Sequence, residues 1–260
     1  MRLALFGATG RMGITVARLA PGAGFELVGA ACAADDPALG RDIGELAGLG
    51  TLGVVTSADV GSALLGADVV IDFSTAAAVP ALLAAAARQK VAVVSGTTNL
   101  GEPGKAALQR AAASVPVLWA ANMSIGVQVL AELVSEAMRR LGPGFDVEIV
   151  EVHHRKKVDA PSGTAKRLAD AAKLARGGLR ELHGRDGDVG ARTQDEIGVF
   201  GVRGGDVIGE HTVYLLGPGE RIELTHRATS RELFAHGALR AAQFVVGKPA
   251  KLYAIADVLG

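Results

Sequence analysis

The first half of the chain repeats one pattern, in which a short apolar run is followed by a longer segment rich in alanine and leucine. The apolar runs lie at residues 2–6, 25–32, 53–57, 67–74, 91–97 and 116–122. Such runs suit strands that are buried on both faces of a sheet, and the segments between them, such as 76–89 and 104–114, have the composition of helices. Strands that alternate with helices predict a doubly wound, Rossmann-like α/β unit with a parallel sheet, in which ligands bind beyond the carboxyl ends of the strands.

A glycine-rich turn, GATGRMG, follows the first predicted strand. Gly7, Gly10 and Gly13 are spaced three residues apart, and a helix is predicted directly after them. Such a turn lets the backbone approach a pyrophosphate and aims the N–H groups of the helix at it. Glycine-rich turns also serve plain packing, so the motif alone leaves two interpretations open. Its place in an N-terminal βαβ unit favours dinucleotide binding.

Three further strands, ending at residues 72–74, 95–98 and 120–124, end in small or polar residues. These ends suggest a single binding edge, although turn formers are common at strand ends for other reasons. The second strand is followed by Ala33 and Ala34, and Asp35 and Asp36 come slightly later. Either aspartate could bind a ribose hydroxyl, but we favour solvated turn residues, which leaves the choice between NAD and NADP open.

The second half has a different pattern. Residues 126–142 predict a long amphipathic helix, and from Phe145 the apolar residues recur with the period of a strand. Residues 211–229 predict a hairpin around Gly-Pro-Gly, and residues 177–195 a long loop. This half is therefore expected to be an α+β domain with a mixed sheet, beginning near Ser124. The C-terminal tail predicts a helix and a short closing element.

The stretch EVHHRKKVDAPSGTA, residues 151–165, places two histidines before Arg155, Lys156 and Lys157. Ser162 or Thr164 can cap the helix that follows, and the N-terminus of that helix attracts anions. Cations beside a helix N-terminus are typical of a carboxylate or phosphate clamp, and a histidine there can supply a proton near neutral pH. A solvated basic loop with an ordinary N-cap would give the same spacing.

Composition excludes several classes of protein. Lys plus Arg and Asp plus Glu are both 27, so no basic excess points to nucleic acid or to an acidic membrane surface. The single cysteine, Cys32, forms no disulfide within the chain and has no partner pattern of a thiol nucleophile. No window approaches the length of a membrane span. We therefore expect a cytoplasmic protein.

The histidines do not predict a metal site, because two adjacent histidines without a nearby cysteine or patterned carboxylate make a poor ligand set. The remaining histidines are scattered and are expected to be structural or surface residues. They are His183, His211, His226 and His236.

With these motifs in place, the chain resembles the 4-hydroxy-tetrahydrodipicolinate (dihydrodipicolinate) reductase family essentially from end to end. GATGRMG, IDFS, SGTTNL and AANMSIGV are similar to the nucleotide-side motifs of that family, and EVHHRKKVDAPSGTA is the most specific match. GVFGVRGGDVIGEHTV, ELTHRATSRELFAHGALRAA and LYAIADVL are similar to its C-terminal half.

The resemblance implies an NADH- or NADPH-dependent oxidoreductase of lysine and diaminopimelate biosynthesis that reduces a small cyclic imine with two carboxylates. It implies His153 as the proton donor, Lys157 as a second cationic donor that binds substrate, and His154, Gly163 and Thr164 as carboxylate ligands. The implied cofactor contacts are Gly7, Ala8, Thr9, Gly10, Arg11, Met12, Phe73, Gly96, Thr97, Thr98, Ala120, Ala121, Asn122 and Met123.

The resemblance also implies a homotetramer and a discontinuous dinucleotide-binding domain, residues 1–124 and 234–260, around a substrate-binding and oligomerisation domain, residues 125–233. The chain departs from the family at Ala33 and Ala34, where many members have an acid followed by a base, and at Thr75, where some have arginine. Two alternatives stay open from the residues alone: another two-domain nicotinamide-dependent amino-acid or semialdehyde dehydrogenase, and a non-catalytic dinucleotide sensor.

Overall fold

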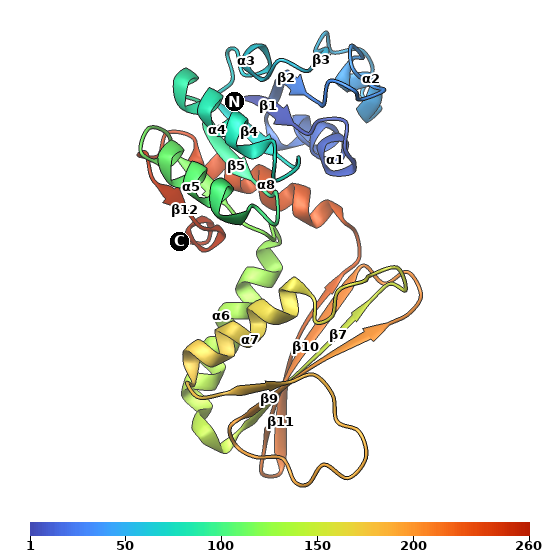
Figure 1. The fold of residues 1–260 in the computed structure, drawn as a ribbon, viewed down its shortest axis with the longest axis vertical. Coiled ribbons are helices and arrows are strands. Elements are labelled where there is room, and N and C mark those ends of the chain that lie inside the picture. Colours follow the sequence, from blue (N-terminus) through green and yellow to red (C-terminus); the bar gives the residue numbers. More distant parts are fainter. The chain divides into compact units, whose positions relative to one another are not determined.

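The structure is a computed structural model that describes all 260 residues. The chain divides into two compact units (Figure 1). Unit 1 consists of Met1–Ser124 and Glu232–Gly260, and unit 2 consists of Ile125–Arg231. The C-terminal segment returns to unit 1, so this unit is built from two separate parts of the sequence.

Unit 1 contains a parallel sheet of seven strands in the order β12-β6-β5-β4-β1-β2-β3. Every strand pair in it is parallel, and each strand is short and largely buried. The predicted doubly wound sheet is therefore confirmed, with shorter strands than the apolar runs suggested. The strands are β1 (Arg2–Phe6), β2 (Glu26–Ala31), β3 (Thr56–Ser57), β4 (Val69–Asp72), β5 (Ala92–Ser95), β6 (Val117–Trp119) and β12 (Leu252–Tyr253).

Helices cover both faces of this sheet. On one face, α4 and α5 pack on each other and on an apolar core of alanine, valine and leucine. On the other, α8 packs against α1 and against β4, β5 and β6 (Figure 1). A Cβ at Gly237 of α8 would lie 1.7 Å from the carbonyl oxygen of Met123, so glycine is what allows this approach. The helices are α1 (Arg11–Leu19), α2 (Ile43–Ala47), α3 (Val60–Ala63), α4 (Val79–Gln89), α5 (Gly101–Ala112) and α8 (Glu232–Val245), with 3₁₀ turns η1 (Pro21–Ala23) and η3 (Ile255–Val258).

Unit 2 is a mixed sheet of five strands in the order β11-β10-β7-β9-β8, as the α+β prediction expected. β10 is antiparallel to β7 and β11, and β9 is parallel to β7 and β8. Two helices lie side by side against this sheet and share its apolar core (Figure 1). The elements are α6 (Ile125–Leu141), η2 (Gly142–Gly144), β7 (Asp146–His153), α7 (Gly163–Ala175), β8 (Arg180–Leu182), β9 (Glu196–Arg203), β10 (Gly209–Gly217) and β11 (Glu220–Ala228).

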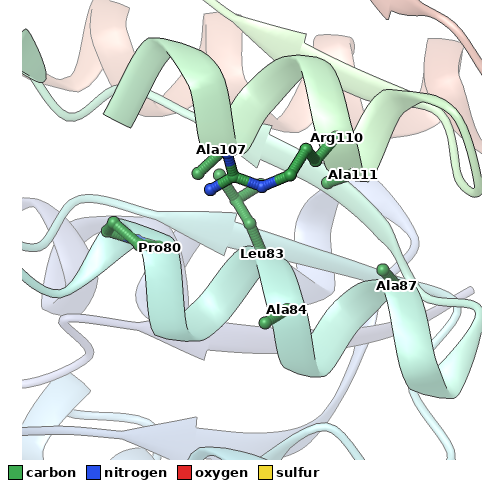
Figure 2. Close-up of a pocket in the computed structure, with 7 residues that line it drawn as sticks. All are labelled: Pro80, Leu83, Ala84, Ala87, Ala107, Arg110 and Ala111. Atoms are coloured by element: carbon green, nitrogen blue, oxygen red, sulfur yellow. The ribbon is translucent and has the colours of Figure 1, made fainter. Parts of the chain in front are cut away.

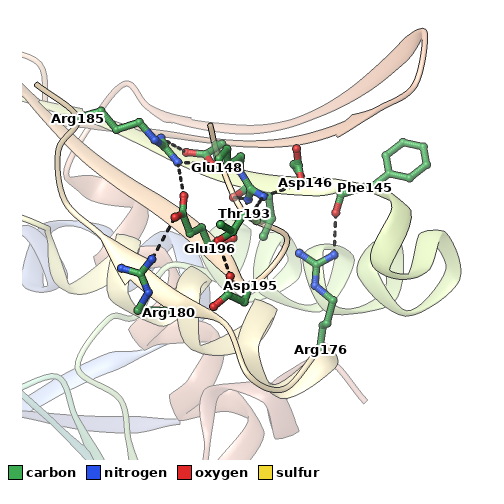
Figure 3. A network of polar contacts seen from close by, with 11 residues as sticks. Phe145, Asp146, Glu148, Arg176, Arg180, Arg185, Thr193, Asp195 and Glu196 are labelled. Atoms are coloured by element: carbon green, nitrogen blue, oxygen red, sulfur yellow. Dashed lines mark hydrogen bonds and ion pairs between the residues drawn. The ribbon is translucent and has the colours of Figure 1, made fainter. Parts of the chain in front are cut away.

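The segment predicted as a loop over residues 177–195 contains the short edge strand β8, so that prediction is wrong in part. No apolar alternation marks β8, because its three residues are exposed or half-buried. Ion pairs hold the segment in place instead (Figure 3). Glu148 accepts hydrogen bonds from Arg185 and Arg192, and Glu196 from Arg180 and Arg185. Each partly exposed pair contributes little alone, so the segment depends on the network as a whole.

Candidate active site

The glycine turn of unit 1 is shaped by packing and also leaves a helix end open. Gly7 has a φ of +74°, and a Cβ there would lie 2.7 Å from the carbonyl oxygen of Phe73. A Cβ at Gly13 would lie 2.3 Å from the carbonyl oxygen of Gly7. Gly10 is the N-cap of α1 and supplies no side-chain cap, so the N–H groups of Arg11 and Met12 remain available. Packing therefore requires Gly7 and Gly13, and the same turn also leaves N–H groups that a dinucleotide could bind.

A buried carboxylate ties the ends of β4 and β5 together, and an indole hydrogen bond joins the end of β6 to them. Asp72 is 0% exposed and accepts hydrogen bonds from Ser95 Oγ at 2.5 Å and Thr97 Oγ1 at 2.9 Å. It also accepts one from the backbone N–H of Ser74 at 2.8 Å. The indole Nε1–H of Trp119 donates to the carbonyl oxygen of Thr97 at 2.9 Å. The three predicted strand ends thus form one connected edge, and Asp72 is a structural residue that the sequence analysis did not single out.

Phe73 and Gly96 are packed on each other at this edge, because a Cβ at Gly96 would lie 2.3 Å from the Phe73 ring. Thr98 and Ala121 are exposed beside them, and Thr97 is buried. Met123 is only 1% exposed, and its carbonyl faces Gly237, so its side chain belongs to the core. The structure therefore places the predicted cofactor residues on the strand ends of one sheet, with differing exposure.

Asp36 is tied to the glycine turn. Thr9 Oγ1 donates to Asp36 Oδ2 at 2.6 Å, and the backbone N–H of Ala38 donates to Asp36 Oδ1 at 2.8 Å. The hydrogen bond from Thr9 is the main cause that lowers the pKa of the Asp36 carboxyl below its ordinary value. Asp36 is thus fixed as an anion, whereas Asp35 is exposed as expected of a turn residue.

These features fit a dinucleotide. A turn without side chains and an uncapped helix N-terminus suit a pyrophosphate, and the strand ends supply a rigid edge beside them. The residues that would hold NADH or NADPH are those of the glycine turn and of the β4, β5 and β6 ends.

In unit 2, buried and partly buried residues alternate along β7 to its end, but the last two buried positions carry polar side chains. Val147 and Ile149 are buried, while Asp146 and Glu148 lie on the opposite face. The register of β7 against β9 and β10 runs without a break, so Glu151 and His153 fall on the buried face. The strand therefore places the carboxylate of Glu151 and the imidazole of His153 together on the buried face of the sheet.

Glu151 is 0% exposed and has four hydrogen-bond donors around it. Arg203 donates from Nη1 to Oε2 and from Nη2 to Oε1, both at 2.7 Å. The Ser162 backbone N–H donates to Oε1 at 3.0 Å, and His153 Nδ1 lies 2.5 Å from Oε2. Burial alone would raise the pKa of Glu151, but the hydrogen bonds from Arg203, His153 and Ser162 outweigh it and hold the pKa below its ordinary value.

His153 is 8% exposed, and its Nε2 makes no hydrogen bond. Burial lowers the pKa of His153, and its hydrogen bond to Glu151 opposes that effect. A Cβ at Gly209 of β10 would lie 2.9 Å from Nε2, so glycine leaves this nitrogen uncovered. The geometry thus dedicates Nδ1 to Glu151 and leaves Nε2 for a ligand.

His211 is a buried neighbour of His153. Its ring packs edge-on against the His153 ring with centroids 5.1 Å apart, and its Nε2 lies 3.0 Å from Ser162 Oγ. Burial, with a contribution from His153, lowers the pKa of His211 to about 3. His211 is therefore a structural residue and not a surface residue, which are the two possibilities that the sequence left open. The alternation of β10, which buries Val213 and Leu215, could have located His211 in the interior.

The cations of residues 155–157 separate into two groups. Arg155 and Lys156 are exposed. Lys157 is half-buried, and its Nζ donates to both carboxylate oxygens of Asp159 at 2.8 and 2.9 Å. This hydrogen bond is the main cause that lowers the pKa of Asp159. Only Lys157 therefore has the fixed position that a ligand contact needs.

The N-terminus of α7 is capped by Ser162, whose Oγ accepts from the Ala165 N–H at 3.1 Å. Gly163 is exposed, and a Cβ there would meet nothing within 4 Å, so packing does not require glycine at this position. His154 follows the end of β7; its backbone N–H donates to the Val207 carbonyl, and its Nε2 lies 3.5 Å from Arg231 Nη2. These residues share the loop region that follows β7.

Two hollows in the surface lie elsewhere. One, of about 150 Å³, lies between α4 and α5, where Arg110 extends over Leu83 and several alanines (Figure 2). The other, of about 340 Å³, lies between α6 and α7 and includes Arg167 and Gln128. Neither contains a predicted site residue. No group of three or more histidine, cysteine, aspartate or glutamate side chains could hold a metal ion, and no helix is long and apolar enough to cross a membrane.

A doubly wound parallel sheet with an open glycine turn, joined to a mixed-sheet unit with a buried His–Glu pair, fits a two-domain nicotinamide-dependent oxidoreductase. Residues 1–123 match the family described as dihydrodipicolinate reductase, N-terminus, and residues 126–259 match dihydrodipicolinate reductase, C-terminus. The chain belongs to the dihydrodipicolinate reductase family.

Relatives support this assignment over the full length. The chain is 51% identical to the 4-hydroxy-tetrahydrodipicolinate reductase of Anaeromyxobacter sp. (strain Fw109-5), over 98% of this chain and 96% of that protein. It is 48% identical to the one of Myxococcus xanthus (strain DK1622), over 100% and 98% of the two chains. The fold matches dipicolinate-bound dihydrodipicolinate reductase from Paenisporosarcina sp. TG-14 with a TM-score of 0.80, 24% identity and coverage of 98% and 97%. It also matches amine dehydrogenase from Mycobacterium smegmatis with a TM-score of 0.63, 15% identity and coverage of 99% and 95%.

The buried His211 predicts sensitivity to acid. Its pKa of about 3 in the folded chain lies below the ordinary value of 6.5, so between these pH values the unfolded chain binds a proton that the folded chain does not. The free energy of unfolding should therefore fall by about 1.4 kcal/mol for each pH unit below 6.5 from this group. Denaturant unfolding at pH 7 and pH 4.5 should show a smaller fall in His211→Gln than in the wild type.

His183→Gln is the matched control, because the His183 side chain is 52% exposed. This variant should keep the acid sensitivity of the wild type. An equal fall in all three proteins would contradict the role given to His211.

Proposed function

We propose that the chain catalyses the NAD(P)H-dependent reduction of 4-hydroxy-tetrahydrodipicolinate to tetrahydrodipicolinate, a step of lysine and diaminopimelate biosynthesis. The observation that carries the proposal is the buried Glu151–His153 pair, with an uncovered Nε2, in a chain that belongs to this family over its full length. The domain formed by residues 1–124 and 234–260 would bind the dinucleotide, and residues 125–233 would bind the substrate.

The cofactor would be held by the backbone of Gly7 to Met12 and by the strand-end residues. The strand-end residues are Phe73, Gly96, Thr97, Thr98 and Ala120 to Met123. Bound NADH or NADPH supplies the hydride of the reaction. The chain contributes a rigid edge, because Asp72 ties β4 to β5 before any ligand arrives.

The substrate is a cyclic imine with two carboxylates. Lys157, His154 and the first N–H groups of α7, at Gly163 and Thr164, are the ligands we assign to those carboxylates. Gly163 supports the assignment, because an exposed glycine that packing does not require permits close approach of a ligand to the backbone. A charged lysine and a helix N-terminus together orient the ring, which is the contribution of proximity to catalysis.

His153 would deliver the proton. The 4-hydroxyl group of the substrate leaves as water, which gives a conjugated ring. The hydride adds to this conjugated system and leaves negative charge on the ring as an enamine, which a proton at carbon quenches. Since Nδ1 is engaged by Glu151, the donor would be the N–H at Nε2 of the protonated imidazole. Without substrate, burial keeps the pKa of His153 below its ordinary value. A second negative group beside the ring, such as a substrate carboxylate, would raise this pKa and favour the protonated form.

The assembly we propose is a cytoplasmic homotetramer. In support, the sheet face of unit 2 opposite to α6 and α7 leaves Val150, Val152, Phe200 and Tyr214 half-buried in the single chain, and Val202 is 48% exposed. An uncovered apolar face of this kind is typical of a subunit contact. The molar mass in solution, by light scattering, tests this part: a monomer would contradict it.

The catalytic assignment predicts selective losses of turnover. His153→Gln should lower kcat by about 10²- to 10⁴-fold, because it removes the acid. Lys157→Ala should lower turnover and raise KM for the substrate, because it removes a charged ligand. Both variants should bind NADH nearly as the wild type does. The assay couples the preceding synthase, with pyruvate and aspartate semialdehyde, to nicotinamide absorbance.

Lys156→Ala is the matched control for Lys157→Ala, because Lys156 is the exposed neighbour. It should leave turnover unchanged. Wild-type turnover in either His153→Gln or Lys157→Ala would refute the role of that residue. Folded wild-type protein that binds NADH but shows no synthase-dependent oxidation would refute the function itself.

The fixed carboxylate of Asp36 predicts a preference for NADH. An acidic side chain after the second strand binds a ribose hydroxyl and repels the 2′-phosphate of NADPH. Ala33 and Ala34 offer no charge, so Asp36, held by Thr9, is the group we expect to discriminate. Asp36→Ala should raise the ratio of kcat/KM for NADPH to that for NADH, and Asp35→Ala should leave the ratio unchanged. An unchanged ratio in Asp36→Ala would show that discrimination lies elsewhere.

A further inference from the structure

We propose that Glu151, locked in place by Arg203, is a positioning residue that fixes the tautomer of His153 and sets the pH range in which His153 carries its proton. The inference rests on the proposed function, in which His153 is the acid. It concerns neither a substrate ligand nor a cofactor ligand, since the Glu151 side chain is 0% exposed.

Both oxygens of the Glu151 carboxylate are fully occupied by hydrogen-bond donors. Oε1 accepts from Arg203 Nη2 and the Ser162 N–H, and Oε2 accepts from Arg203 Nη1 and His153. The same bonds lower the pKa of Glu151, so it is an anion and can only accept. His153 must therefore donate from Nδ1, which leaves Nε2 as the atom that gains and loses a proton.

Charged and neutral groups of opposing effect surround the His153 ring. His153 faces the anion of Glu151 on its own strand and the cation of Arg203 on β9. It also faces the neutral ring of His211 on β10 and the cation of Lys157, which is itself paired with Asp159. Glu151 is the group in direct contact that favours the imidazolium, while Lys157 and Arg203 oppose it.

Arg203 also connects Glu151 to the loop that carries Lys157. Arg203 Nη2 also donates to the carbonyl oxygen of Asp159 at 2.7 Å. Asp159 in turn holds Lys157. One guanidinium therefore contacts both the partner of the acid and the segment that carries the cationic ligand. Its ion pair with the buried Glu151 is rigid, because breaking it would leave a buried charge uncompensated.

The test uses two substitutions with opposite expected effects on the pH dependence of kcat in the synthase-coupled assay. For a general acid, kcat falls as the pH rises through the pKa of His153. Glu151→Gln removes the anion, so this fall should move to lower pH by about one unit, which is about a tenfold lower kcat at pH 8. Arg203→Gln removes an opposing cation, so the fall should move to higher pH.

Glu148→Gln is the matched control, because Glu148 lies on the same strand, faces the opposite side and also accepts from two arginines. Its pH profile should coincide with that of the wild type. A uniform loss of kcat at every pH in both Glu151→Gln and Arg203→Gln, without movement of the profile, would show a merely structural role and overturn the proposal.

A second measurement separates this inference from the proposed function. Nitrogen-15 NMR of histidine-labelled protein reports the tautomer and the pKa of His153 directly, with the His153→Gln spectrum as the assignment. The wild type should show the Nδ1–H tautomer and Glu151→Gln a lower pKa. Wild-type protein without reductase activity but with these shifts would refute the function alone, and an unchanged His153 pKa in an active Glu151→Gln would refute the positioning role alone.

Discussion

The buried ion pair between Glu151 and Arg203 is the interaction on which unit 2 depends. A carboxylate that is 0% exposed would be unfavourable alone, and the guanidinium of Arg203 makes its burial possible with two hydrogen bonds of 2.7 Å. Because the remaining lone pairs of Glu151 bind His153 and the N-terminus of α7, the pair connects three elements. The acid, the helix end and the strand are thus set relative to one another by one anion.

Unit 1 reaches the same kind of rigidity by close backbone contact. Gly7, Gly13 and Gly237 stand where any Cβ would collide with a carbonyl oxygen, and Asp72 joins the ends of β4 and β5 from within. A binding edge built in this way needs no ligand to assemble it. Both units therefore supply preorganised groups, and this is the protein's share of a reaction whose hydride comes from a nicotinamide.

Much of this could be predicted from the sequence, for physical reasons. Strands buried on both faces read as unbroken apolar runs, and the turn after β1 must be glycine, so the doubly wound sheet and its open edge were both visible. The stretch from His153 to Thr164 was visible through its charge. The partners of these residues were not visible, because Arg203 lies fifty positions from His153 in the sequence. The strand β8 was not visible either, because it has no periodic pattern. Glu151 and His211 could have been found from the uninterrupted alternation of β7 and β10, which buries both.

If His153 is the acid, it should take up a proton when a dicarboxylate binds beside it. Calorimetric titration of the NADH-bound protein with dipicolinate, at pH 7.5 in buffers of different ionisation enthalpy, measures that proton directly. We expect net proton uptake in the wild type and its loss in His153→Gln, because two added negative charges favour the imidazolium. Dipicolinate binding with no proton uptake in the wild type would contradict the role of His153 as the acid.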